Sequence, residues 1–406
     1  MKLIKLDCKV KISDLPIALS YTDIRSDLKS CTPGQWAIFQ TNKENKESQH
    51  YIGYANPFAE NNKILRLIKE VKLDELVLND EDVVKNILEE CLAIAFSRRE
   101  FCKEMLGPCC RMFYGDQDGL PGLIIDKYCN ALILQINTAG IDCYEKTITD
   151  YLKKYYDLPI LYFENSNLRK IESLPSRPRI MSQIEKNLKI LEVFDNKVLI
   201  KIPIEEAQKA GFYFDHSYNR LKLLHLLHDL NLRELKILDL FCYAGAWGFA
   251  LIRHGFAKHV HFVDQGDFMK TLAETAICNS IISEKFKFTR DNVFTFFESN
   301  NEKYDLIICD PPALAKSNSK ISQAIEGYKK LFRQCLLHIN NNGILVAASC
   351  THGISLEELS KLIGLEGRKA NRVLAILDMG TQRIDHPISS LSGSAFYLKY
   401  ICYHVS

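Results

Sequence analysis

The chain has 406 residues, of which 47% are hydrophobic and 25% are charged, so it is long enough for two or three domains that each bury a core. Its formal net charge of +2 gives no global basic signal, so any contact with nucleic acid has to come from local clusters of basic residues. The N-terminus has no long apolar segment, and no stretch is long and apolar enough to span a bilayer. We therefore expect neither secretion nor membrane insertion.

The cysteines favour a cytoplasmic protein. None of the fourteen forms a C-x-x-C pair, and several lie inside apolar runs, as Cys242, Cys309 and Cys402 do. That distribution is typical of reduced, mostly buried thiols. We therefore expect no disulfide framework and no metal site.

Residues 1–72 are predicted to form a small β-rich domain. Their short strand-like runs are separated by turn signals at 32–34, in the polar stretch 42–49 and at 56–57. Lysines near the N-terminus are candidates for an RNA-binding surface, although scattered lysines are as often only a solvated face. These lysines are Lys2, Lys5, Lys9 and Lys11.

Residues 73–190 are predicted to form a central α+β domain. A helix-like segment covers 81–104, and a strand-turn-strand stretch follows it. Carboxylates are frequent from Asp116 to Asp126, which invites a metal or acid-base interpretation. Because the Asp-Gly and Pro-Gly pairs in this stretch are turn chemistry, we expect its acids to be structural and to face solvent.

Residues 191–406 alternate apolar strand-like runs with helix-like segments, which predicts an α/β domain on a doubly wound parallel sheet. The run 236–241 suits a strand that is covered on both faces, and a turn of small residues follows it. Gly245 and Gly248 allow this turn to be tight and to approach a ligand closely. The expected ligand is a nucleoside-type cofactor.

Three further strand-like runs end in polar residues that suit such a cofactor. The run 259–263 ends at Asp264, where a doubly wound sheet places the acid that binds a ribose. Asp291 and Asn292 suit an adenine edge, and Asp310 lies at the ligand-binding crevice. The glycines of the first turn are spaced G-x-x-G rather than G-x-G-x-x-G, which favours S-adenosylmethionine over a dinucleotide.

In this order the four runs resemble the class I S-adenosylmethionine-dependent methyltransferases. The strands of residues 1–72 resemble the RNA-binding PUA module of some ribosomal RNA methyltransferases. Residues 116–128 resemble G-x-x-D-G-L-P-G-L-I-V-D-x-Y, the signature of their central domain. Residues 208–220 are similar to Q-K-T-G-F-Y-x-D-Q-R-x-N-R, from which Ala210, His216 and Ser217 depart. Nearly the whole chain therefore resembles the RlmI-type 23S ribosomal RNA cytosine-C5 methyltransferase family.

This resemblance implies a fold, a cofactor and a partner. The fold is a Rossmann-like methyltransferase domain that binds S-adenosylmethionine, preceded by the PUA-like and central domains. The partner is 23S ribosomal RNA, while a ribosomal subunit precursor as substrate and a homodimer stay open. The matched motifs give as cofactor residues Gln208, Tyr213, Asp215, Arg220, Asp239, Phe241, Tyr243, Gly245, Asp264, Asp291, Asn292 and Asp310.

The same resemblance points to a covalent mechanism. Cytosine C5 is too weak a nucleophile to take a methyl group unaided, so a nucleophile must first add at C6 and turn the ring into an enamine. Cys350 ends an apolar strand in the same crevice as Asp310, and it matches the cysteine of the family's S-C-S motif. We expect Cys350 to be the nucleophile and Asp310 to protonate or hydrogen-bond cytosine N3.

Some assignments stay open. Ala313 stands where better-known RNA cytosine-C5 methyltransferases have a second cysteine, so the base that removes the C5 proton is unassigned, with His352 as a candidate. Cys309 is expected in the core, because neighbouring side chains of a strand face opposite ways. The alternatives to C5 methylation are guanine-N2 methylation on the same Asp-Pro-Pro motif, a non-catalytic PUA-bearing ribosome-assembly factor and a nicotinamide oxidoreductase.

Overall fold

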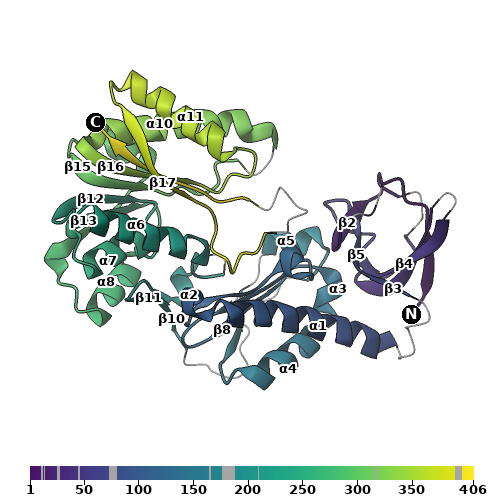
Figure 1. The fold of residues 1–406 in the computed structure, drawn as a ribbon. Helices are drawn as coiled ribbons and strands as arrows, with labels where there is room; N and C mark the ends of the chain where they lie inside the picture. Colours follow the sequence, from purple (N-terminus) through teal and green to yellow (C-terminus); the bar gives the residue numbers. More distant parts are fainter. Residues whose placement is uncertain are drawn as a thin grey trace. The chain divides into compact units, whose positions relative to one another are not determined.

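In a computed structural model the chain folds into two compact units, residues 1–188 and 189–406 (Figure 1). The structure describes residues 1–10, 12, 14–24, 28–43, 46–72, 80–163, 166–175, 188–208, 210–315, 318–388 and 396–406. Lys11 and Lys209, which the sequence patterns include, lie outside these ranges. The division of the first unit at residue 72 stays a prediction, because residues 73–79 also lie outside them.

The N-terminal part of the first unit is a five-stranded sheet. Its strands are β1 (Leu3–Leu6), β2 (Ile17–Ser20), β3 (Gln35–Lys43), β4 (Lys46–Ala55) and β5 (Lys63–Val71). They lie in the order β1-β3-β4-β5-β2, and a core around Phe39, Ile64 and Leu67 fills the sheet's inner face. The predicted β-rich region is therefore confirmed, while its assignment to the PUA fold stays a prediction.

The rest of the first unit combines a four-stranded sheet with helices. The helix expected over 81–104 is confirmed, but it is divided in two at Cys102. The strands of this sheet lie in the order β6-β7-β8-β9. The helices and strands of this part are α1 (Asp80–Phe101), α2 (Lys103–Leu106), β6 (Cys110–Tyr114), β7 (Leu123–Lys127), β8 (Leu132–Ile136), α3 (Ala139–Asp142), α4 (Glu145–Tyr155), β9 (Ile160–Tyr162) and α5 (Ser166–Ile171).

Two carboxylates of the predicted turn stretch are buried in ion pairs. Asp118 accepts hydrogen bonds from both terminal nitrogens of Arg99, at 2.8 and 2.6 Å. Asp126 is fully buried, and its Oδ1 lies 2.8 Å from Nε of Arg111. The expectation that these acids face solvent is wrong for both of them. Turn residues are usually exposed, but here arginines on α1 and β6 cover the stretch, and no local pattern encodes that pairing.

The second unit is built on a seven-stranded sheet. Its strands are β12 (Leu235–Leu240), β13 (Ala257–Asp264), β14 (Phe286–Arg290), β15 (Tyr304–Cys309), β16 (Ile339–Ser349), β17 (Leu374–Gly380) and β18 (Lys399–Val405). They lie in the order β14-β13-β12-β15-β16-β18-β17, and only the pairs made by β18 are antiparallel. Because the chain winds outward in both directions from β12, the switch point lies at the carboxyl ends of β12 and β15.

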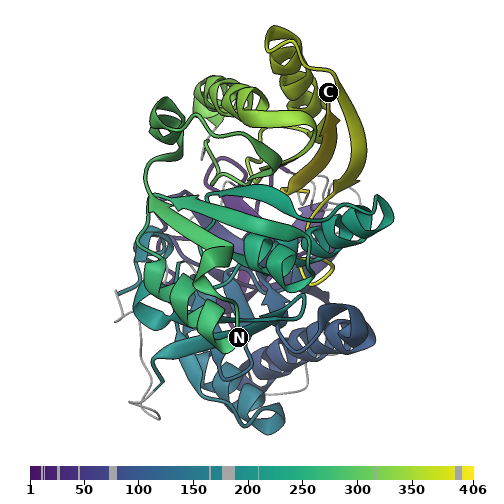
Figure 2. The ribbon, with the colours of Figure 1, turned by 90° about the vertical axis from the view of Figure 1, so that its left-hand side faces the viewer.

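Helices cover both faces of this sheet, so the predicted α/β class is confirmed (Figures 1 and 2). Helices α10 and α11 cover one face, while α6, α7 and α8 lie on the other (Figure 1). The core under α10 and α11 includes Leu238, Ile307 and Leu345 from three central strands. The remaining elements are β10 (Ile190–Asp195), β11 (Val198–Pro203), α6 (Ser217–Asp229), α7 (Ala246–Arg253), α8 (Met269–Cys278), α9 (Val293–Ser299), α10 (Ile321–His338) and α11 (Leu356–Lys369).

All fourteen cysteines are thiols, and seven of them are buried, which is fewer than the predicted majority. Cys309 lies in the core of the second unit, as expected from strand alternation. Among the residues that the structure describes, no helix is long and apolar enough to cross a membrane.

Candidate active site

The turn between β12 and α7 carries three residues with left-handed backbone. The φ angles are 59° at Phe241, 44° at Tyr243 and 70° at Gly245. A non-glycine residue in this region costs about 1–3 kcal/mol, and such strain concentrates at functional sites. The turn therefore deviates from regular structure at the switch point of the sheet.

The two glycines of this turn are explained by packing. A Cβ on Gly248 would lie 2.3 Å from the Phe262 ring, and one on Gly245 would lie 2.6 Å from Leu272. The residues that require glycine here belong to the sheet and to α8. The glycines thus allow α7 to pack close to the sheet, in addition to allowing a tight turn.

The Tyr243 side chain joins this turn to the segment before α6. Its hydroxyl donates to the carbonyl oxygen of Gly211 at 2.7 Å and accepts from the backbone N–H of Gln208 at 3.1 Å. The Tyr213 hydroxyl donates to Oε1 of Gln208 at 3.2 Å, and the Tyr213 and Tyr243 rings meet edge to face. The structure thus brings together three of the predicted cofactor residues from two separate motifs.

Three predicted carboxylates gather around the switch point. Asp264 is buried, and its oxygens accept from the backbone N–H groups of Tyr243 at 3.1 Å and Gly266 at 2.9 Å. Asp239 is also buried, and its Oδ2 accepts from the N–H of Gly248 at 3.0 Å. Burial raises the pKa of Asp239 to about 8, and the charges of Asp310 and Asp264 act in the same direction. The site therefore carries a carboxylate cluster that is short of positive charge.

Two aromatic side chains lie against the Asp310 carboxylate, and one of them donates a hydrogen bond to it. Its Oδ2 accepts from the indole N–H of Trp247 at 3.3 Å, and its Oδ1 lies 3.3 Å from Nε2 of His216. His216 is one of the positions that depart from the family pattern, and it is buried against the Trp247 ring. The carboxylate of Asp310 is a quarter exposed, so it remains accessible to a substrate.

Cys350 follows β16 and lies between two side chains that face α10. The buried Tyr328 hydroxyl lies 2.8 Å from both Ser349 Oγ and Thr351 Oγ1. The Tyr328 hydroxyl thus fixes the residues on both sides of Cys350, and with them the backbone that carries the thiol.

Tyr213 lies within electrostatic range of both predicted catalytic residues. Burial raises its pKa, and the charges of Asp215, Cys350 and Asp310 add to that shift. Since Asp310 follows β15 and Cys350 follows the adjacent β16, all three side chains belong to one site. The predicted proximity of the nucleophile and the acid is supported by this geometry.

Two other predicted cofactor residues have structural partners. Arg220 donates from Nε to Oδ2 of Asp195 at 2.8 Å and lies over the rings of Phe212 and Trp247. Asp215 accepts from the Tyr397 hydroxyl at 2.7 Å. These contacts tie α6 to β10, and the segment before α6 to the chain that leads into β18.

The last predicted pair lies at the start of α9. Asn292 caps this helix, with its side chain accepting from the N–H of Phe294 at 2.9 Å. Asp291 accepts from the N–H of Asn292 at 2.7 Å. Because the Asn292 oxygen is engaged by the helix, its amide nitrogen and the partly exposed Asp291 carboxylate are the groups left for an adenine edge.

These residues fit S-adenosylmethionine, whose sulfonium and ammonium groups are positive. Asp239 Oδ1 is buried and has no hydrogen-bond partner among the described residues. An unsatisfied carboxylate oxygen beside Asp264 and Asp310 favours a cationic ligand. A pyrophosphate would add negative charge to the same cluster, so the electrostatics favour S-adenosylmethionine over a dinucleotide.

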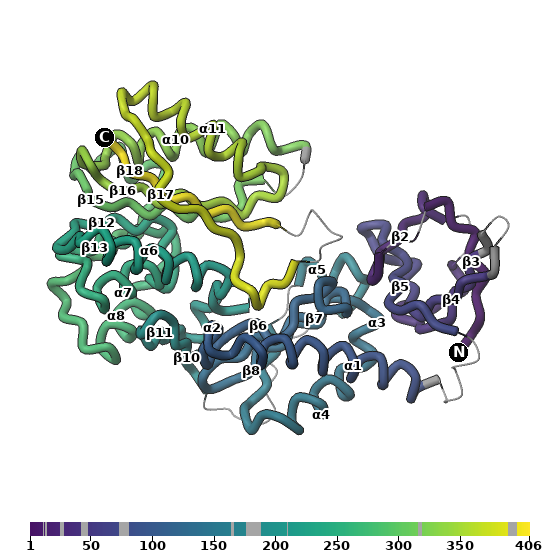
Figure 3. Tube along the Cα trace, viewed as in Figure 1, coloured from purple at the N-terminus to yellow at the C-terminus, as the bar shows by residue number. Residues whose placement is uncertain are grey.

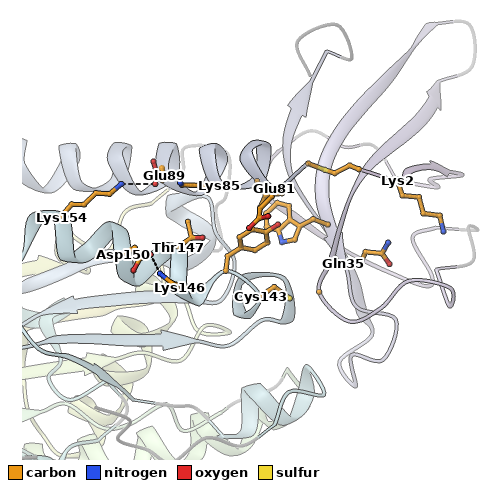
Figure 4. Close-up of a pocket in the computed structure, with 15 residues that line it drawn as sticks. Lys2, Gln35, Glu81, Lys85, Glu89, Cys143, Lys146, Thr147, Asp150 and Lys154 are labelled. Carbon is orange, nitrogen blue, oxygen red and sulfur yellow. Dashed lines mark hydrogen bonds and ion pairs between the residues drawn. The ribbon is translucent and has the colours of Figure 1, made fainter. Parts of the chain in front are cut away.

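The first unit has a cavity of about 820 Å³ that holds none of the predicted catalytic or cofactor residues (Figure 4). Its walls come from the N-terminal segment, β3, α1 and α4, and they carry both charges. Lys146 pairs with Asp150 at 2.5 Å and Lys154 with Glu89 at 3.4 Å, and Figure 4 draws no interaction between Lys2 and the other lining residues. Lys2, one of the RNA candidates, therefore lines this cavity.

Comparison with known proteins identifies the class of this site. Residues 220–364, which include β12 to β16, match the family model described as the methyltransferase small domain. Most of the second unit therefore matches a methyltransferase domain. The comparisons also agree with the prediction of an S-adenosylmethionine-dependent enzyme.

Relatives of the full chain agree with this class. Ribosomal RNA large subunit methyltransferase I of Yersinia pseudotuberculosis serotype O:1b is 28% identical over 294 residues, which cover 71% of this chain and 72% of the relative. The solved structure of SMU.776 complexed with SAH covers 100% of both chains with a TM-score of 0.77 at 19% identity. The SAM-dependent methyltransferase from Agrobacterium tumefaciens covers 73% of this chain and 90% of its own, with a TM-score of 0.52 at 13% identity. The resemblance predicted from the sequence is confirmed.

Sequence reasoning missed three residues of the methyltransferase site. Trp247 holds Asp310, Tyr397 holds Asp215, and Lys399 is buried beside the Cys350 turn. A local signal existed only for Lys399, which is a charged residue at the start of the apolar run 400–403. The other two contacts join segments far apart in the chain.

The raised pKa of Asp239 predicts a pH dependence of stability. The folded state binds a proton up to about pH 8, whereas an ordinary aspartate has a pKa of 3.8. Folding is therefore opposed by this group as the pH rises from about 4 to about 8. We expect Asp239→Asn to raise Tm relative to wild type at pH 8.5 but not at pH 4. The rise should be about 2–4 °C for each kcal/mol by which the substitution increases the free energy of unfolding.

Differential scanning calorimetry across this pH range would measure the difference. Asp229→Asn is the matched control, because Asp229 is exposed on α6. A Tm difference between Asp239→Asn and wild type that is the same at every pH would contradict a raised pKa at Asp239.

Proposed function

We propose that the protein transfers the methyl group of S-adenosylmethionine to C5 of a cytosine in 23S ribosomal RNA. The observation that carries this proposal is the position of Cys350 and Asp310 after adjacent strands, both within range of Tyr213. Methylation of an exocyclic amine needs no cysteine at this place. The relatives named as large-subunit ribosomal RNA methyltransferases support the class of substrate.

The cofactor would lie along the carboxyl ends of β12, β13 and β14. Asp264 would accept hydrogen bonds from the ribose hydroxyls, and Asp291 would hold the adenine edge. Asp239 and Tyr243 lie on the turn where the charged end of the cofactor would bind, with Gln208 and Tyr213 covering it. When bound, S-adenosylmethionine supplies an electrophilic methyl group on its sulfonium.

The residues of the chain would act on the cytosine in three steps. The Cys350 thiolate would form a bond from Sγ to C6, and Asp310 would donate or share a proton at N3 as negative charge develops on the ring. C5 would then take the methyl group, whose carbon loses its bond to the sulfonium sulfur. A base would remove the C5 proton, the electron pair of that C–H bond would expel Sγ from C6, and N3 would return its proton to Asp310. His352, the candidate base, is exposed and stacks on Tyr397.

The first unit would bind the RNA. Lys5 lies on β1 and Lys2 and Lys9 flank that strand, and lysines bind phosphates with release of counterions. We expect the protein to act in the cytoplasm on 23S ribosomal RNA or on a subunit precursor. Mass-spectrometric mapping of ribosomal RNA modifications, with and without the protein, tests this proposal. Parallel assays on naked RNA and on subunit precursors would distinguish the two substrates.

Replacing Asp264 tests the cofactor site. Hydrogen bonds to a charged partner contribute about 1.5–3 kcal/mol, so Asp264→Ala should weaken S-adenosylmethionine binding by roughly 10- to 150-fold. Isothermal titration calorimetry measures the affinity. Asp267→Ala, in an exposed ion pair with Arg290, is the control and should bind normally. Unchanged affinity in Asp264→Ala, or tighter binding of NAD than of S-adenosylmethionine, would overturn the assignment.

Replacing Cys350 separates C5 methylation from amine methylation. Ribosomal RNA containing 5-fluorocytosine should form a stable methylated adduct with the wild-type protein, because fluorine replaces the proton whose loss releases the enzyme. Cys350→Ala should lose both the adduct and turnover while binding S-adenosylmethionine normally. Gel electrophoresis of the crosslinked RNA and incorporation of labelled methyl groups measure the two effects.

Cys278→Ala is the matched control, since Cys278 is an exposed thiol of the same unit and should leave both readouts unchanged. If Cys350→Ala methylates RNA near the wild-type rate, Cys350 is a structural thiol and guanine-N2 methylation becomes the better assignment.

Replacing the N-terminal lysines tests the RNA surface. Changing Lys2, Lys5 and Lys9 together to Gln should weaken RNA binding and reduce its salt dependence, with the slope of log K against log salt falling by about 0.7 per lost phosphate contact. Fluorescence anisotropy at several salt concentrations gives both values. A triple Gln variant at Lys103, Lys146 and Lys170, elsewhere in the first unit, is the control. Equal losses in the two triple variants would refute a specific role for the N-terminal lysines.

A further inference from the structure

Lys399 is a buried cation beside the turn that carries Cys350. It is the first residue of β18, and its backbone pairs with Ser349, the residue before Cys350. Only 4% of Lys399 is exposed, although lysine is among the residues most rarely buried. A lysine is therefore placed in the interior next to the proposed nucleophile.

Backbone carbonyl groups fix the Lys399 ammonium. Its Nζ donates to the carbonyl oxygen of Thr351 at 2.6 Å and to that of Tyr397 at 2.8 Å. Thr351 directly follows Cys350, so the ammonium lies against the same turn as the thiol. β18 lies between β16 and β17 in the sheet (Figure 3), and its pairing with β16 brings a residue near the C-terminus to this turn.

Within the part of the chain that the structure describes, this ammonium contacts carbonyl oxygens and no carboxylate. Burial lowers the pKa of Lys399 to about 8, and the charge of Cys350 acts in the opposite direction. A buried cation without an anionic partner is costly, whereas a paired one is tolerated. The group available to serve as that anion is the Cys350 thiolate.

The other ionisable groups near the thiol are two phenols, one exposed histidine and two carboxylates. Burial raises the pKa values of Tyr328 and Tyr213, so both phenols stay protonated at neutral pH. His352 is exposed and stacks on the Tyr397 ring. The carboxylates near the site are Asp310 and Asp215, and neither acts on the pKa of Lys399.

We propose that Lys399 is the counter-ion that holds Cys350 as a thiolate. The thiolate is then the resting form of the nucleophile, and no base is needed to deprotonate it when RNA binds. On addition, the electron pair of Sγ forms the bond to C6, and the ammonium keeps its proton and its two carbonyl partners. When the product forms and Sγ leaves C6, the thiolate returns to the same ion pair. The role of the pair in methylation rests on the proposed function, but the ion pair itself does not.

The pH dependence of Cys350 alkylation tests the ion pair without RNA or cofactor. The full-length protein is treated briefly with iodoacetamide from pH 5 to 10, and peptide mass spectrometry quantifies the modification of Cys350. We expect a midpoint at least one pH unit below the ordinary thiol value of about 8.5. In Lys399→Met the midpoint should rise by at least one unit, which lowers the Cys350 rate at pH 7 by roughly tenfold.

Controls separate this effect from a loss of structure. Cys278 in the same digest is an exposed internal reference, and its alkylation should not change between variants. Lys399→Arg keeps the positive charge and should retain most of the lowered midpoint. Lys222→Met removes a partly exposed lysine of the same unit that pairs with Asp378, and it should leave the Cys350 midpoint unchanged. If Lys399→Met does not fold, the Cys350 midpoints of Lys399→Arg and Lys399→Gln are compared instead, because these two variants place a charged and a neutral polar side chain at the same position.

The outcomes distinguish this proposal from the proposed function. A wild-type midpoint at or above 8.5, or equal midpoints in wild type and in the folded neutral variants, would overturn the role of Lys399. A low, Lys399-dependent midpoint in a protein that forms no adduct with 5-fluorocytosine RNA would keep the ion pair and overturn cytosine-C5 methylation. In a C5 methyltransferase, Lys399→Met should also shift the pH profile of kcat upward, and Lys399→Arg should restore it.

Discussion

The parallel pairing of β12, β15 and β16 is the constraint on which the rest of the site depends. Backbone hydrogen bonds set Leu240 against Cys309, and Cys309 against Ala347. Each strand then ends at the same edge of the sheet, so the residues that follow are forced together whatever their distance in the sequence. Asp310 and Cys350 are neighbours for this reason. The turn of Tyr243 lies at the same edge because it follows the central strand.

Charge is distributed unevenly around this edge. Carboxylates gather near β12, β13 and β15, where burial and mutual repulsion raise the pKa of Asp239. The buried Lys399 lies on the other side, next to Cys350. A cationic cofactor suits the first region and an anionic nucleophile suits the second. The two regions thus favour opposite charges within one site, and the protein interior strengthens both preferences because few waters screen them.

Side chains outside the strands keep this edge in shape. Tyr328 fixes both neighbours of Cys350 from α10, and the Tyr243 hydroxyl fixes the segment that covers the turn. Trp247 donates a hydrogen bond to Asp310 from α7. The contacts of Tyr328, Tyr243 and Trp247 are each made by a polar group with a defined partner. The reactive side chains are therefore positioned by hydrogen bonds as well as by packing.

The sequence by itself determined where central strands of the second unit lie along the chain, the α/β class and the positions of Asp264, Asp310 and Cys350 after strand-like runs, because apolar runs that end in polar residues are local patterns. It also placed Cys309 in the core, since strand alternation is local. Only the tertiary structure decided which charges are paired. Asp118 and Asp126 are covered by arginines that local turn chemistry could not reveal, and Lys399 meets the Cys350 turn because its strand pairs it with Ser349. Long-range pairing depends on the completed fold, so its partners cannot be identified from neighbours in the chain.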